Sequence, residues 1–202
     1  MTLNDASLKL ILNYEVGGGQ LYYDRHLRFP VWPNGESGVT IGVGYDLGYN
    51  TRAGVTAAWD PRIGEEKTDR LLHCIGIKGE AAHLLLPSVR DVEIPWDAAL
   101  SVFLNTDVPT EWRSACRTYP GIENLHPNAQ GAILSMGFNR GWSLNGPRRT
   151  EMLAIRPLVL AKDYAGIADQ ILAMKRIWAG TPIEDGMYAR RNAEATLVES
   201  IA

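Results

Sequence analysis

The first apolar stripe along the chain predicts an amphipathic helix. Leu8, Ile11 and Leu12 are spaced three and four residues apart, which places them on one helical face. Asp5 suits the N-cap, and the glycines at 17–19 stop the pattern. We therefore expect a helix from Asp5 to the residues just before these glycines.

The pattern then changes to that of a small β-sheet, up to about residue 50. Residues 21–23 and 39–44 carry strand-forming side chains, and the turn-forming cluster Pro33-Asn34-Gly35 lies between them. We expect both segments to be strands of a hairpin or small sheet.

From about residue 51 the periodicity is almost wholly helical, interrupted by proline and glycine. The expected helices are 51–59, 65–75, 78–86, 96–105, 110–118, 126–139, 158–178 and 185–201. The chain thus predicts an α+β fold in a single domain, 1–202. Its β-bearing lobe spans about 15–50, and its helical lobe about 51–202.

Composition and net charge argue against one class of function. The chain is 46% apolar and 21% charged with a net charge of −3, which argues against a nucleic-acid binder. The segment 140–191 nevertheless carries nine basic and five acidic residues, a local +4 that suits a solvated face or a groove for an acidic polymer.

Cys74 and Cys116 define no disulfide framework, and no metal-ligand spacing accompanies them. We expect neither a signal peptide nor insertion into a membrane.

Glu15 is the first candidate for chemistry. It continues the apolar stripe of Leu8, Ile11 and Leu12 into the last turn of the expected helix. Burial and the helix dipole would both favour its protonated form there, which suits a general acid. The alternative is that Glu15, next to the glycines at 17–19, turns into solvent.

The segment Val39–Asp46 is the second candidate. Alternation predicts Val39, Ile41 and Val43 on a core face, with Thr40, Gly42 and Gly44 opposite. A face with so little side chain is expected where a ligand approaches the backbone. The alternative is a glycine-bent hairpin, in which Asp46 caps the turn before Gly48.

At these residues the chain resembles the phage-type lysozymes, the family 24 glycoside hydrolases. Their pattern is a Glu ending the first helix, an Asp nine residues later in a Tyr-x-Asp unit, and a Thr-Ile-Gly-x-Gly strand. Here these correspond to Glu15, to Tyr22 with Asp24, and to 40–44. The chain departs from that pattern by extra residues at about 26–38.

A second resemblance is to the lysozyme-like bacteriocin pesticin and its relatives, whose catalytic Asp follows the Thr by six residues. Asp46 keeps that step from Thr40. Farther along, residues 128–141 resemble the central helix of the phage lysozymes, and 185–194 their C-terminal Arg-Arg helix.

The resemblance implies a muramidase that hydrolyses the β-1,4 bond between N-acetylmuramic acid and N-acetylglucosamine in peptidoglycan glycan strands. Glu15 would protonate the leaving oxygen. Asp46, with Thr40, would hold the attacking water or stabilise the oxocarbenium-like transition state, and Asp24 is the alternative partner. No metal or organic cofactor is required.

Asn139 and Arg140 are expected to reach sugar hydroxyls or peptide carboxylates, although Asn139 could instead cap its helix before Gly141. Arg190 and Arg191 are expected to pair with acids on the helix surface, such as Glu194.

Several alternatives remain open. One is a binding module that holds the cell wall without hydrolysis, and another is a lytic transglycosylase, which also uses a Glu but forms an anhydro-sugar. As a toxin-like effector, the protein would have an immunity protein as partner. Made in the cytoplasm without a signal, a monomeric endolysin or effector would reach the periplasm through a holin or a secretion machine.

Overall fold

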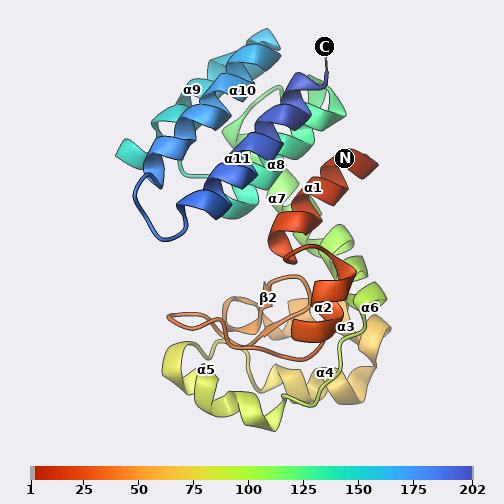
Figure 1. The fold of residues 1–202 in the computed structure, drawn as a ribbon. Coiled ribbons are helices and arrows are strands. Elements are labelled where there is room, and N and C mark those ends of the chain that lie inside the picture. Colours follow the sequence, from red (N-terminus) through yellow and green to blue (C-terminus); the bar gives the residue numbers. More distant parts are fainter. Residues whose placement is uncertain (1–2, 202) are drawn as a thin grey trace. The chain divides into compact units, whose positions relative to one another are not determined.

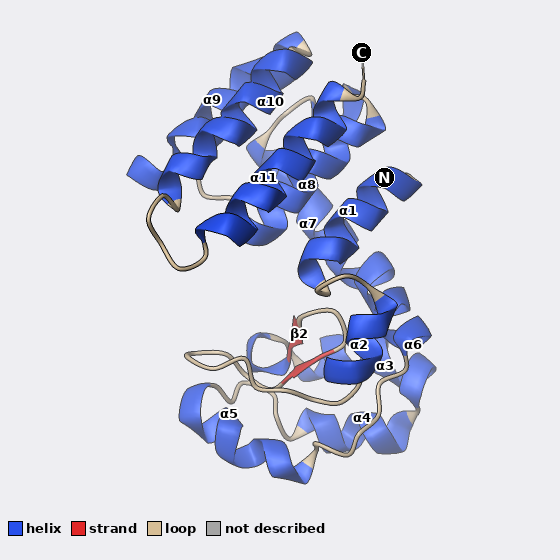
Figure 2. Cartoon of the chain, viewed as in Figure 1, coloured by secondary structure: helices blue, strands red, loops and turns tan. Residues whose placement is uncertain are grey.

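The structure is a computed structural model that describes residues 3–201, and it is mainly helical with one small antiparallel hairpin (Figures 1 and 2). The chain forms two compact units. Unit 1 comprises 1–14 and 109–202, and unit 2 comprises 15–108. The α+β class with a mainly helical body is therefore confirmed.

Unit 2 contains the hairpin and five helices. The strands are β1 (Thr40–Ile41) and β2 (Tyr45–Asp46), and the helices are α2 (Gln20–His26), α3 (Arg52–Ile63), α4 (Glu65–Leu72), α5 (Gly79–Leu85) and α6 (Trp96–Val102). The β-bearing lobe that was expected to end at about residue 50 thus extends to Val108. The reason is a shared core, because the fully buried Trp59 of α3 lies against the hairpin at Gly42.

Unit 1 contains the remaining helices, apart from the ends of α1 and α7. They are α1 (Asp5–Glu15), α7 (Val108–Thr118), α8 (Pro127–Arg140), α9 (Thr150–Ala161), α10 (Tyr164–Ala173) and α11 (Glu184–Glu199). Helix α8 is buried along most of its length, and α10 packs between α9 and α11 (Figure 1). The buried Ser7 of α1 donates a hydrogen bond to the carbonyl of Pro127, 3.1 Å away, at the start of α8.

Two expected strand segments differ from the structure. Residues 21–23 belong to helix α2, because Tyr23 turns inward to full burial and donates a hydrogen bond to the carbonyl of Ile94 at 2.9 Å. The strand expected over 39–44 is paired only at Thr40–Ile41, since Gly42 and Gly44 adopt positive φ angles of 60° and 77° in the hairpin turn.

The helices also depart from expectation where proline was taken as a break. Pro61 lies inside α3, and α7 begins before Pro109. The long helix expected over 158–178 is instead two helices, α9 and α10, with a 3-10 turn after α10. The carboxylate of Asp163 caps α10 by accepting a hydrogen bond from the amide of Gly166 at 2.9 Å, so a new helix begins there.

Candidate functional site

Thr40 and Asp46 are brought directly opposite each other. They form a Cα pair in the β1–β2 ladder, as the short hairpin requires. Thr40 is 8% exposed, and its hydroxyl donates to the carbonyl of Gly38 at 3.3 Å. Its backbone amide and carbonyl bond to Val31, at 2.8 and 3.0 Å. Thr40 therefore ties the loop before β1 to the hairpin.

The carboxylate of Asp46 is occupied by backbone amides. The amide of Gly38 lies 3.1 and 3.0 Å from its two oxygens, and the amide of Gly48 donates to Oδ1 at 2.8 Å. Asp46 thereby caps the 3-10 turn 47–49. The capping role that the sequence offered as an alternative is confirmed, and any catalytic role must coexist with it.

The bare strand face predicted opposite Val39, Ile41 and Val43 is not present. Thr40 and Gly42 are buried, and a Cβ added to Gly42 would lie 2.8 Å from a ring carbon of Trp59. Gly42 is therefore small because an indole occupies the space, and not because a ligand approaches there.

Glu15 is the last residue of α1 and the first of unit 2, and it is half-buried. In the stripe that leads to it, Ile11 is fully buried whereas Leu8 and Leu12 are half-buried. Gly17 follows with a φ of 56° and turns the chain toward α2. The helix therefore ends where the sequence predicted, with Glu15 in its last turn.

Asp24 lies exposed on α2, next to the buried Tyr23. Tyr22, 42% exposed, packs on the imidazole of His26 with ring centroids 4.5 Å apart. The helix places Asp24 on its solvent side. Glu15, Asp24, Thr40 and Asp46 all belong to unit 2.

Asn139 and Arg140 belong to unit 1, at the end of α8. Asn139 is exposed, and the helix cap is Gly141, whose amide donates to the carbonyl of Gly137 at 2.7 Å. The cap proposed for Asn139 is therefore supplied by Gly141, whose positive φ of 66° is tolerated best by glycine.

Arg140 lies in a strongly basic environment. Its guanidinium is 5.1 Å from the ring centroid of Trp178 and donates to the carbonyl of Arg148 at 2.7 Å. Burial, followed by the charges of Arg149, Arg148 and Arg191, lowers the pKa of Arg140 to about 10. The local positive charge of segment 140–191 indicated a cluster of basic side chains, but it did not identify Arg148 and Arg149 as neighbours of Arg140.

Arg190 and Arg191 do pair with Glu194, but in the core and not on the surface. Glu194 and Arg191 are fully buried, and Glu194 Oε1 accepts from Arg190 Nε at 3.2 Å, Arg191 Nη2 at 2.8 Å and Ser135 Oγ at 2.7 Å. Burial raises the pKa of Glu194, and the two guanidiniums oppose that shift. This cluster joins α11 to α8, so both arginines have a structural use.

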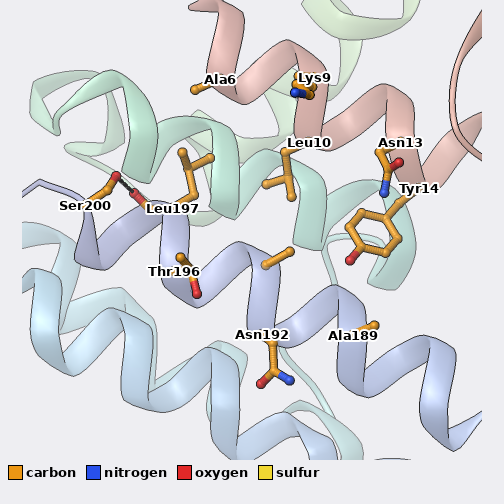
Figure 3. A pocket seen from close by; sticks show the side chains of 11 residues that line it. Ala6, Lys9, Leu10, Asn13, Tyr14, Ala189, Asn192, Thr196, Leu197 and Ser200 are labelled. Carbon is orange, nitrogen blue, oxygen red and sulfur yellow. Dashed lines mark hydrogen bonds between the residues drawn. The ribbon is translucent and has the colours of Figure 1, made fainter.

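A groove of about 760 Å³ lies on unit 1 between α1 and α11 (Figure 3). It is mostly apolar, and its walls include Leu10 and Tyr14 from α1 and Ala193 and Leu197 from α11. None of its lining residues is among the candidates from the sequence.

Metal-binding clusters and membrane-spanning helices are absent from residues 3–201. No group of three or more His, Cys, Asp or Glu side chains in this range could hold a metal ion. The helices of this range are all too short or too polar to cross a bilayer. Cys74 and Cys116 are both free thiols.

Comparison with known families gives one match. A family model described as "Domain of unknown function (DUF8812)" matches residues 11–109, slightly less than half of the chain. The matched span contains the whole of unit 2, and with it Glu15, Asp24, Thr40 and Asp46. A comparison with curated proteins found no match.

Proposed function

We propose that this protein is a muramidase that cleaves the β-1,4 bond between N-acetylmuramic acid and N-acetylglucosamine, with Glu15 as general acid. The observation that carries the proposal is the Thr40–Asp46 pair across the hairpin, in the unit that begins at Glu15. The motif resemblance predicts these same three residues to act together. The mainly helical α+β fold is compatible with this function.

In the proposed mechanism, Glu15 protonates the glycosidic oxygen as the bond breaks. Asp46 stabilises the positive charge that develops on the sugar ring or orients the water. The amides of Gly38 and Gly48 hold its carboxylate in one position, which reduces the cost of ordering it during the reaction. Asp24, exposed and on a different element, is the alternative carboxylate.

The hydrogen bonds to Asp46 also favour a second candidate, a lytic transglycosylase. A carboxylate already accepting from two backbone amides has less capacity left for a water molecule. A reaction that forms an anhydro-sugar needs the acid Glu15 but no activated water. The two candidates share the substrate and differ in the product.

The experiment is product analysis by mass spectrometry on purified sacculi, with the wild type, Glu15→Gln and the matched control Glu36→Gln, an exposed carboxylate of unit 2. We expect reducing-end products from the wild type and the control, and none from Glu15→Gln, which should keep a native circular dichroism spectrum. Anhydro-products would identify a transglycosylase. Binding to sacculi without any product would reject catalysis and leave a binding module.

As a muramidase, the protein would work in the periplasm, which it would reach through a holin or a secretion machine. An effector role would add an immunity protein that blocks the site. Purification of the protein with a small partner that inhibits it on sacculi would support the effector role over that of an endolysin.

A further inference from the structure

A hollow on unit 2 is lined by the segment that the phage-lysozyme pattern lacks. It has a volume of about 450 Å³, within the range of small-molecule and peptide sites. One wall is 29–32, and the other is formed by His83, Leu86, Pro87 and Arg90. The extra residues at about 26–38 therefore build a concave surface on this unit.

The wall at Trp32 is held in place on two sides. The indole stacks on His83, with ring centroids 4.6 Å apart and an interplanar angle of 12°. Its Nε1 donates to the carbonyl of Ser37 at 3.0 Å. A side chain fixed by stacking and by a hydrogen bond loses little freedom when a ligand binds, so the hollow is preorganised.

Arg90 supplies a positive charge to the hollow. Two neighbouring arginines are each paired with a carboxylate of the segment that follows Arg90, Arg28 with Glu93 and Arg70 with Asp91. Arg90 is exposed and has no hydrogen-bond or ion-pair partner among residues 3–201. The hollow thus contains a guanidinium able to bind a carboxylate through two parallel hydrogen bonds.

The lining decides between ligand classes. Sugar hydroxyls donate as well as accept, so their sites need acceptor side chains, yet no Asp, Glu, Asn or Gln lines the hollow. Its polar side chains are Arg90, His83 and Trp32, and the rest are apolar, with Phe29 45% exposed. The complementary ligand is a carboxylate attached to a short aliphatic body, as in a peptide.

The hollow is joined to the candidate site through Val31. This residue lines the hollow, and its backbone bonds to Thr40 in both directions, at 2.8 and 3.0 Å. We propose that the hollow binds the carboxylate-bearing stem peptide of the wall, with Arg90 on the carboxylate, while the glycan lies at Thr40 and Asp46. The choice of the stem peptide rests on the proposed function.

Binding is tested first without catalysis, by NMR and calorimetric titration of the full chain with the tripeptide L-Ala-γ-D-Glu-L-Lys. We expect saturable shifts at His83 and the Trp32 indole, and at least a tenfold loss of affinity when both peptide carboxylates are amidated. Arg90→Gln should give the same loss, and Arg90→Lys a smaller one. Arg52→Gln, an exposed arginine of α3 outside the hollow, is the matched control and should bind as the wild type does.

A linear peptide of L-residues, L-Ala-L-Glu-L-Leu, separates the wall from a protein tail as the source of the ligand. Tighter binding of this peptide than of the stem tripeptide would overturn the assignment. So would equal affinity for the amidated tripeptide, or wild-type affinity in Arg90→Gln.

A kinetic comparison keeps this proposal separate from the function. On peptide-bearing glycan, Arg90→Gln should raise KM several-fold with kcat retained, and on amidase-stripped glycan both constants should be unchanged. If the wild type cleaves neither substrate, the muramidase proposal fails, and the titration still tests whether the hollow binds the peptide. If it cleaves both and Arg90→Gln has no effect, the function stands and the hollow is no peptide site.

Discussion

Asp46 accepts hydrogen bonds from the backbone amide of Gly38 through both carboxylate oxygens, at 3.1 and 3.0 Å. The two residues are eight positions apart, and their contact closes the loop between the extra segment and the hairpin. Asp46, the proposed catalytic carboxylate, thus also stabilises the local fold. Its variants must therefore be measured for both stability and activity.

The first prediction compares Asp46→Asn with Asp24→Asn. In Asp46→Asn, the new side-chain amide would place an NH₂ group against the backbone amide of Gly38, so we expect a loss of about 1–3 kcal/mol in the free energy of unfolding. Asp24 is exposed, and its substitution should stay within about 0.5 kcal/mol. Urea unfolding measures both, and the sacculus assay should show the greater loss in Asp46→Asn. A greater loss in Asp24→Asn would move the catalytic role to Asp24.

The second prediction concerns Gly38. A Cβ on Gly38 would lie 2.4 Å from Asp46 Oδ1 and 2.5 Å from the amide nitrogen of Gly48, so Gly38→Ala must open the capped loop. We expect a destabilisation of more than about 2 kcal/mol in urea unfolding. The control is Gly186→Ala in α11, where nothing lies within 4 Å. That change should stabilise by about 0.5–1 kcal/mol, and similar losses in both variants would contradict the geometry.

The third prediction concerns the buried cluster of α11. Glu194→Gln leaves the fully buried guanidinium of Arg191 without the carboxylate that it pairs with, so unfolding should become easier by about 3–5 kcal/mol. Glu199→Gln, exposed near the end of the same helix, should change stability by less than about 0.5 kcal/mol. A loss below about 1 kcal/mol in Glu194→Gln would mean that the native carboxyl is already protonated.

The fourth prediction is a pH dependence from Cys74. Burial raises the pKa of this thiol from 9.0 to about 11, so above pH 9 the unfolded chain releases its proton while the native protein retains it. Stability should therefore fall between pH 9 and 11, by about 1.4 kcal/mol per pH unit from this group alone. Cys74→Ala should flatten the stability–pH curve in that window, and Cys116→Ala should flatten it less. Equal slopes in all three proteins would show that the Cys74 thiol ionises normally.

The sequence by itself determined those features that depend on neighbouring residues. The stripe of α1, the glycines that end it at Glu15, and the long helices α8 and α11 all follow from local periodicity and backbone preference. The strand expected over 39–44 does not by itself pair Thr40 with Asp46, and it is the turn at Gly42 and Gly44 in the structure that brings them opposite each other.

Tertiary structure alone decided which side chains are buried and what their polar atoms bind. Residues 20–26 form a helix in which the buried Tyr23 donates a hydrogen bond to the carbonyl of Ile94, 71 residues away. Trp59 fills the space beside Gly42. The hollow joins Trp32 to His83, two residues 51 positions apart, and the surface pair expected for Arg191 becomes a core contact because α11 packs on α8. Local pattern carries no information on such contacts, since they depend on packing between segments distant in sequence.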